Sequence, residues 1–201
     1  MLQLRALAIV CAARVHGETG VIARFFTEKH GMVSGYVAGG KGRHLRPVLV
    51  PGNRVQVELS SRSDSQLPSA RPELVESRGP WLGEPLPAAG IGWATALTAS
   101  ALPERHAYPQ LWFALGALLD AICHAPSARG WAAALAGYES LLLRDMGYGA
   151  DGLMPDPDDF AAVLALLDHL GPQIARHTLA DRRSDVMGAR AILRERLSKI
   201  A

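Results

Sequence analysis

Residues 32–59 read MVSGYVAGGKGRHLRPVLVPGNRVQVEL, a stretch in which two strand patterns flank a long loop. The second pattern is the clearer one, because apolar and polar residues alternate strictly through VQVEL, residues 55–59. Such alternation is typical of a half-buried antiparallel strand. The loop runs from Gly39 to about Asn53 and is bounded by glycine-rich turn signals.

The rest of the N-terminal region has the same strand character. Turn signals separate the other expected strands, which are Leu2–Ala12, Val21–Phe26, Met32–Ala38 and a weaker one at Glu73–Glu76. Five short strands in about 75 residues predict a small, closed or nearly closed barrel. The expected fold class is α+β, with an N-terminal OB-fold (a five-stranded β-barrel) at residues 1–80 and an all-α helical domain at residues 81–201.

Helix signals replace strands from Pro87 onward. The expected helices are Pro87–Leu102, one starting at Pro109, Ser127–Gly147 with both end residues as caps, one from Asp156 or Asp158 to Gly171-Pro172, and Ser184–Ile200. Their apolar residues recur at helical spacing, which indicates core positions.

The chain of 201 residues has a formal net charge of only +2, but its halves differ in sign. Residues 1–80 contain 11 basic and 6 acidic residues, whereas residues 81–201 contain 10 and 13. A basic first half is expected of a phosphate-binding surface, although an ordinary solvated surface would also account for this excess.

Features that would indicate an enzyme or a metalloprotein lack the required context. Residues 147–152 match G-x-G-x-x-G, but a helix pattern precedes them, whereas a dinucleotide site needs a strand before and a helix after. The carboxylates of residues 156–159 suit a helix N-terminus better than a cation site. Cys11 and Cys123 support neither a disulfide framework nor a zinc site. We therefore expect no enzyme, no catalytic residue, no metal and no cofactor.

The strongest candidate site is the loop after the third strand. Its cations lie among glycines that let the backbone approach a ligand, and further cations flank the strands. Together these cations predict a DNA-binding groove. They are Arg14, Arg24, Lys41, Arg43, Arg46 and Arg54. Tyr36 could stack a base there, although Tyr36 and Phe25 could equally be core residues. Near the C-terminus a second basic surface is expected at Arg182, Arg183, Arg190, Arg194, Arg196 and Lys199, either as a plain solvated face or as a secondary binding site.

Several N-terminal motifs follow one another in a recognisable order: Arg14-Val15-His16-Gly17-Glu18, Phe26-Thr27-Glu28-Lys29-His30-Gly31, Gly35-Tyr36-Val37-Ala38-Gly39-Gly40, and Arg46-Pro47 through Pro51-Gly52. Their order and spacing resemble those of the RecO recombination mediators of bacterial DNA repair. Residues 138–148, YESLLLRDMGY, are similar to the family's aromatic-Glu-x-x-Leu-Leu-x-x-x-Gly-Tyr helix end.

The resemblance implies an OB-fold protein that binds single- and double-stranded DNA and anneals complementary strands. The implied partners are RecR and the acidic C-terminal tail of single-strand-binding protein, with the RecA recombinase as an indirect partner. The resemblance maps the family's cation before the first turn onto Arg14 and its basic loop onto Lys41, Arg43 and Arg46. With no secretory or membrane-spanning pattern in the sequence, the expected location is the cytoplasm, in association with the nucleoid.

Two departures from the family pattern affect the helical half. The four-cysteine zinc site of many members has no counterpart after the Gly-Tyr element, and Ala136 and Gly137 stand where some relatives carry a tail-binding cation. Arg129 and Arg144 are the remaining candidates for partner binding. An OB-fold interaction module that binds a protein or an RNA is the alternative function.

Overall fold

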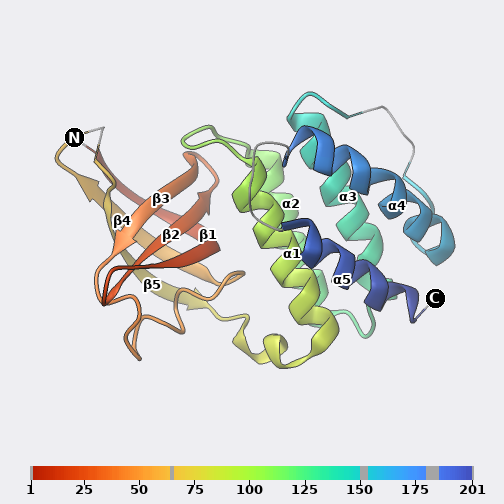
Figure 1. Ribbon diagram of the computed structural model, residues 1–201, viewed down its shortest axis with the longest axis horizontal. Coiled ribbons are helices and arrows are strands. Elements are labelled where there is room, and N and C mark those ends of the chain that lie inside the picture. The colour runs from red at the N-terminus through yellow and green to blue at the C-terminus, as the bar shows by residue number, and fades with distance from the viewer. Residues whose placement is uncertain (1, 64–65, 150–153, 180–185, 201) are drawn as a thin grey trace. The chain divides into compact units, whose positions relative to one another are not determined.

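The computed structural model describes residues 2–63, 66–149, 154–179 and 186–200. The chain divides into two compact units. The first consists of Met1–Gly83 and Leu102–Trp112, and the second of Glu84–Ala101 and Phe113–Ala201. All the strands belong to the first unit (Figure 1).

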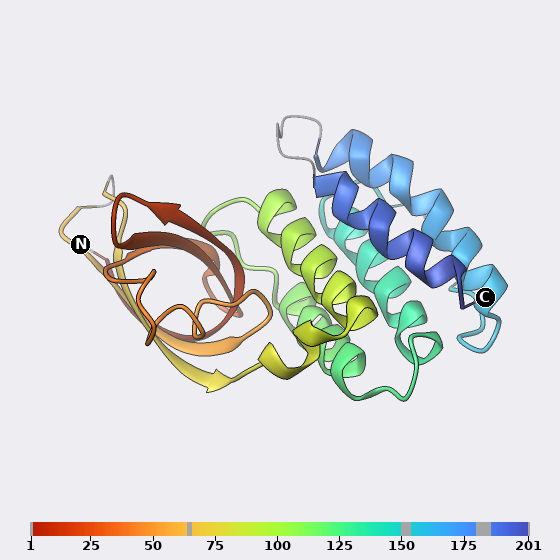
Figure 2. The same ribbon diagram turned by 60° about the horizontal axis from the view of Figure 1, so that its bottom comes forward.

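The first unit is built on a closed five-stranded barrel. Its strands are β1 (Leu2–His16), β2 (Gly20–Thr27), β3 (Gly31–Val37), β4 (Arg54–Ser61) and β5 (Ser69–Glu76). They are hydrogen-bonded in the order β1-β2-β3-β5-β4 and curve around a common interior (Figure 2). The closure is irregular, because β3 and β5 pair in parallel at a single position, Tyr36 with Ser69, whereas all other pairs are antiparallel. The prediction of an OB-like barrel followed by helices, and with it the α+β class, is confirmed.

The barrel interior is filled by the alternate residues of each strand. Val55, Val57 and Leu59 are at most 1% exposed, as the alternation in β4 predicts. They join apolar residues of the other four strands and Leu49 of the loop in one core cluster. Phe25 belongs to this core, whereas Tyr36 is partly exposed. β1 continues to His16, four residues beyond its predicted end, because residues 12–16 pair with β2.

The open edge of β3 is covered by a segment from far along the chain. Glu104 forms a parallel bridge with Met32, and the backbone N–H of Arg105 donates to the carbonyl oxygen of Met32 at 2.8 Å. The Glu104 carboxylate accepts a hydrogen bond from the backbone N–H of Ser34 at 3.0 Å. Residues 104–105 therefore satisfy backbone groups that a neighbouring strand would otherwise pair.

The helical elements are a short 3-10 helix (Gly79–Gly83), α1 (Pro85–Ala101), α2 (Pro109–His124), α3 (Arg129–Asp145), α4 (Phe160–His177) and α5 (Val186–Ser198). Within the second unit α1 packs against α5 and α3 against α4. The sequence predicted each α-helix to within a few residues at its start. No helix in the described part of the chain is both long and apolar enough to span a membrane.

The caps and ends of the helices differ in part from expectation. The predicted C-terminal glycine of α3 is confirmed, because Gly147 has φ +85° and its N–H donates to the carbonyl oxygen of Arg144 at 2.9 Å. The predicted cap Ser127 is wrong by one residue, since the N-cap is Ala128. Asp159 caps α4 by accepting a hydrogen bond from the N–H of Ala162 at 3.0 Å.

The predicted end of α4 at Gly171-Pro172 is wrong, because the helix runs through both residues to His177. Gly171 has a packing role instead. A Cβ at this position would lie 2.5 Å from Nη1 of Arg190, so any other residue here would force that guanidinium to move.

Candidate nucleic-acid interface

The basic loop, residues 38–53, is held in place by the barrel itself. The backbone N–H of Lys41 donates to the carbonyl oxygen of Thr19 in the β1–β2 turn at 3.1 Å. Asn53 is fully buried, and its amide nitrogen donates to two carbonyl oxygens of the loop at 2.8 and 3.2 Å. Its amide oxygen accepts from the N–H of Arg78 at 2.7 Å. These bonds give the loop a defined shape on the barrel.

The loop cations, Lys41, Arg43 and Arg46, are all exposed. Arg43 donates from Nε to the neighbouring His44 ring at 3.3 Å. Across the described ranges, no carboxylate forms an ion pair with a loop cation or with Arg14. Their charges are thus available to an external anion.

Arg14 lies at the same end of the barrel, on the outer face of β1. The strand register places it opposite Ile22, which in turn pairs with Tyr36. Their neighbours in β2 and β3 are core residues, so this row faces outward. The Tyr36 ring contacts the His16 ring edge-on at 6.1 Å between centroids.

A pocket of about 430 Å³, here called the loop pocket, opens beside the loop cations. Its lining comes from β1, β2 and the basic loop and consists of Ala13, Val15, Val21, Gly40, Lys41, Arg46, Leu49, Val50 and Pro51. Gly40 is buried there, and a Cβ at that position would lie 2.8 Å from Cβ of Val21. The glycine therefore lets the loop close directly onto β2.

Two of the expected DNA-binding arginines are already paired with carboxylates. Arg24 donates from Nη2 to the Glu104 carboxylate at 2.9 Å and to the carbonyl oxygen of Leu102 at 3.3 Å. Arg54, at the start of β4, lies 3.7 Å from the carboxylate of Glu76. The structure thus brings Lys41 and Arg46 together at one pocket, with Arg14 at the same end of the barrel, whereas Arg24 and Arg54 each face an acidic partner.

The two candidate partner-binding residues lie at opposite ends of α3. Arg129 donates from Nη2 to the carbonyl oxygen of Ile200 at 2.7 Å, and its guanidinium lies 4.8 Å from the centre of the Phe160 ring. The side chain of Arg144 is 60% exposed and lies 3.7 Å from the carboxylate of Asp145. Both arginines are exposed.

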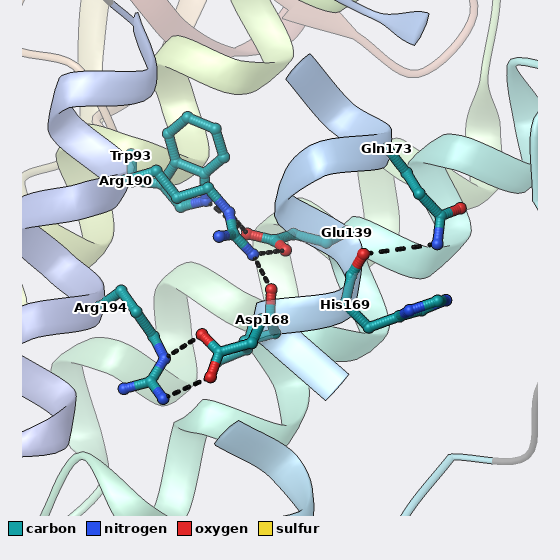
Figure 3. Close-up of polar contacts among 8 residues, drawn as sticks. Trp93, Glu139, Asp168, His169, Gln173, Arg190 and Arg194 are labelled. Atoms are coloured by element: carbon teal, nitrogen blue, oxygen red, sulfur yellow. Dashed lines mark hydrogen bonds and ion pairs between the residues drawn. The ribbon is translucent and has the colours of Figure 1, made fainter. Parts of the chain in front are cut away.

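A buried polar network connects four helices of the second unit (Figure 3). Arg190 of α5 donates to both carboxylate oxygens of Glu139 in α3, at 3.1 and 2.7 Å. Trp93 of α1 donates from Nε1 to the same carboxylate at 2.7 Å, and Arg190 also donates to the carbonyl oxygen of Leu167 in α4 at 2.5 Å. Burial raises the pKa of Glu139, while the hydrogen bonds and charge of Arg190 oppose that shift.

The expected C-terminal basic surface is wrong at Arg190, because this residue is only 8% exposed and its charge is paired inside the unit. Its neighbour Arg194, one turn later, forms an ion pair with Asp168 through two bonds of 2.8 Å near the surface (Figure 3). Arg182 and Arg183 lie outside the described residues. Sequence periodicity cannot reveal a buried arginine whose partner is 51 positions away.

The Tyr138-Glu139 pair therefore has a structural role in this chain. Glu139 forms the centre of the network, and the hydroxyl of Tyr138 hydrogen-bonds the hydroxyl of Thr98 at 2.5 Å. Both side chains are at most 2% exposed.

Comparison with known proteins agrees with both halves of this architecture. A family model described as Recombination protein O N terminal matches residues 1–78, and one described as Recombination protein O C terminal matches residues 86–152. The chain belongs to the RecO family. Helices α4 and α5 follow the residues that the two RecO models match.

Curated RecO proteins share sequence with most of this chain. The protein named DNA repair protein RecO from Phenylobacterium zucineum is 42% identical over 145 residues, which are 72% of this chain and 58% of that relative. The RecO protein of Rhodospirillum centenum is 41% identical over 145 residues, or 72% of this chain and 56% of the relative. This RecO family member thus spans less than two thirds of the length of these relatives.

Sequence reasoning missed several residues that shape the candidate interface. Asn53 reads as a turn residue in the sequence, but in the structure it anchors the basic loop. Glu104 lies in an expected interhelical connection, 80 positions from the Arg24 that it binds. Local composition contains no signal for either contact, because the partners meet only in the folded barrel.

Proposed function

We propose that this chain is a DNA-binding mediator of recombinational DNA repair that works by binding and strand handling, without turnover chemistry. The observation that carries the proposal is the group of exposed cations at one end of an OB-like barrel, which form no ion pair with a carboxylate of the described residues. Membership of the RecO family supports the same conclusion. The proposed ligands are single- and double-stranded DNA, and the proposed actions are annealing of complementary strands and assistance in loading RecA on DNA covered by single-strand-binding protein.

The expected binding mode is electrostatic and tolerant of sequence. Lysine and arginine that neutralise phosphates release counterions, so affinity falls with salt at a log–log slope of roughly −0.7 per phosphate on single strands. If each loop cation contacts one phosphate, replacing all three by alanine should flatten the slope by about 2. Arg14, Arg24 and Arg54 complete the proposed DNA-binding set, with Arg24 and Arg54 contributing only when their carboxylate partners release them.

The test is fluorescence anisotropy of a labelled oligonucleotide across a salt series. The triple variant Lys41→Ala, Arg43→Ala, Arg46→Ala should bind more weakly and with a flatter slope than the parent chain. The matched control removes the same charge from exposed arginines elsewhere on the barrel, Arg5→Ala, Arg62→Ala and Arg71→Ala. Equal losses in both triple variants would refute the assignment to the basic loop. Tighter binding to an RNA oligomer would favour the alternative of an RNA-binding module.

The proposed protein partners are RecR and the acidic C-terminal tail of single-strand-binding protein. Both arginines are exposed, but Arg144 is the better candidate for tail binding because its ion pair with Asp145 is long, at 3.7 Å, whereas Arg129 donates to the carbonyl oxygen of Ile200 at 2.7 Å and also contacts the Phe160 ring. A labelled tail peptide should lose affinity for Arg144→Ala but not for a control such as Arg176→Ala, an exposed arginine of α4. A fluorescent fusion that fails to overlap the nucleoid would contradict the proposed cytoplasmic, nucleoid-associated location.

A further inference from the structure

We propose that the loop pocket binds an unpaired nucleobase of a single strand, while Lys41 and Arg46 hold the phosphates on either side of that base. The inference rests on the proposed DNA binding by the same loop and adds a preference for unpaired over paired nucleotides. Its starting observation is the composition of the pocket. All of its lining residues other than these two cations are apolar or glycine, and none is acidic.

This composition restricts the chemistry of the ligand. An apolar lining offers no hydrogen-bonding side chain to a polar group, so the part of the ligand that enters must tolerate desolvation. The two cations favour anionic groups at the rim. A base attached to a phosphate backbone combines both features, and a volume of about 430 Å³ lies within the usual range of ligand pockets.

The pocket exists before any ligand arrives. The N–H of Lys41 is bonded to Thr19, Asn53 fixes the far end of the loop, and Gly40 allows the loop to pack on Val21. Val15 remains 59% exposed on β1 despite being apolar, so a ligand that covered it would remove hydrophobic surface from water. A preformed site avoids the entropy cost of ordering a loop on binding.

A nucleic acid fits this surface better than an acidic peptide end does. A single terminal carboxylate would need one or two cations, whereas the exposed Arg43 lies between Lys41 and Arg46 in the same loop and adds a third positive charge. A polymer with a phosphate at every residue can use all of them. The base must be unpaired, because bases in a duplex are stacked and can enter a pocket only after being flipped out.

The decisive probe is a pair of oligomers with equal phosphate content, oligo-dT and an abasic oligomer of the same length. Oligo-dT should bind the full chain at least about fivefold more tightly, since stacking or burying one base typically has an effect of this size or larger. Equal affinity for the two oligomers would overturn the inference. Tighter binding of an acidic peptide that competes with oligo-dT would overturn it as well.

A variant that fills the pocket without removing charge tests the location. Ala13→Phe adds a large side chain at an exposed lining position of β1, and Val75→Phe adds the same side chain at a position of β5 that is 59% exposed and outside the pocket. The first change should lower oligo-dT affinity toward that of the abasic oligomer with the salt slope preserved, and the second should not. If Ala13→Phe does not fold, Val15→Ser provides the same comparison by making the lining polar.

The two hypotheses fail in different ways. If the loop does not bind DNA, the triple variant of Lys41, Arg43 and Arg46 binds DNA with the same salt slope as the parent chain. If only the base pocket is wrong, that slope changes as expected but Ala13→Phe and Val15→Ser leave oligo-dT affinity unchanged.

Discussion

Replacing Arg190 by methionine should destabilise the helical unit much more than the same change at Arg194. Arg190 is paired inside the unit with Glu139, which is fully buried, so the change leaves a carboxylate without its main partner. Breaking a buried ion pair by removing one partner costs about 3–5 kcal/mol. Arg194 pairs with an Asp168 side chain that is 57% exposed, for which about 0–1 kcal/mol is expected. The two residues lie one turn apart on α5, so helix propensity is nearly matched.

The pH dependence of this difference is a sharper test. The pKa of Glu139 is raised from its ordinary value of 4.5 by burial, and the loss of the Arg190 bonds raises it further. A carboxyl group that binds its proton more tightly when folded favours folding at low pH, and this contribution is lost as the pH rises toward the folded-state pKa. The penalty of Arg190→Met should therefore grow as the pH rises past the folded-state pKa of Glu139 in the parent chain, which lies above 4.5, by about 1.4 kcal/mol for each unit by which the variant raises that pKa further.

The assay is thermal and denaturant unfolding followed by circular dichroism at 222 nm, for both variants and the parent chain, between pH 4 and 8. A fall in melting temperature of roughly 10 °C at neutral pH corresponds to the expected loss in a chain of this length. A penalty that is equal for the two variants, or that does not change with pH, would refute the role assigned to the Glu139 network.

Four further results are expected. Glu104→Gln should cost at most about 1 kcal/mol. By removing the negative charge beside Arg24 it should also steepen the salt dependence of DNA binding by about 0.7, and a weaker slope would contradict the proposed role of Arg24. Asp159→Ala should destabilise α4 by about 1 kcal/mol in thermal unfolding through loss of the N-cap bond, while an unchanged melting temperature would argue against that cap. Burial raises the pKa of Cys11 to about 12, so iodoacetamide at pH 8 should modify it in the native chain far more slowly than after unfolding, as mass spectrometry can show. The hydrogen bond from Arg194 lowers the pKa of Asp168 from 3.8. The stabilising contribution of the Asp168 carboxylate is therefore present above about pH 3.8 and is lost below it. An NMR titration should show that the pKa of Asp168 rises in Arg194→Met.

The barrel was readable from the sequence because its signal is local. Alternation through residues 55–59 predicts one buried face whatever the neighbouring strand is, and the structure buries that face. The sequence predicts only the second half of β5, because Arg71 and Pro72 carry little strand pattern. Its register is set by pairing with β4, in which Pro72 lies opposite Val57.

The helix starts were predicted well, whereas the end of α4 was not. Caps and apolar periodicity are properties of neighbouring residues, so they appear directly in the sequence. A glycine followed by a proline is a sound local stop signal, but at residue 171 the glycine makes room for Arg190 from another helix.

The sequence by itself determined the order of strands and helices along the chain, the excess of basic residues in the first half and the cluster of cations in residues 41–46. Only the tertiary structure decided which cations are available for binding, because pairing depends on carboxylates far along the chain. Arg24 meets Glu104 and Arg190 meets Glu139, whereas the loop cations meet no acidic partner within the described residues. The local pattern thus specifies where charges occur, and the folded chain decides, through burial and long-range pairing, whether each charge stabilises the protein or is available to a ligand.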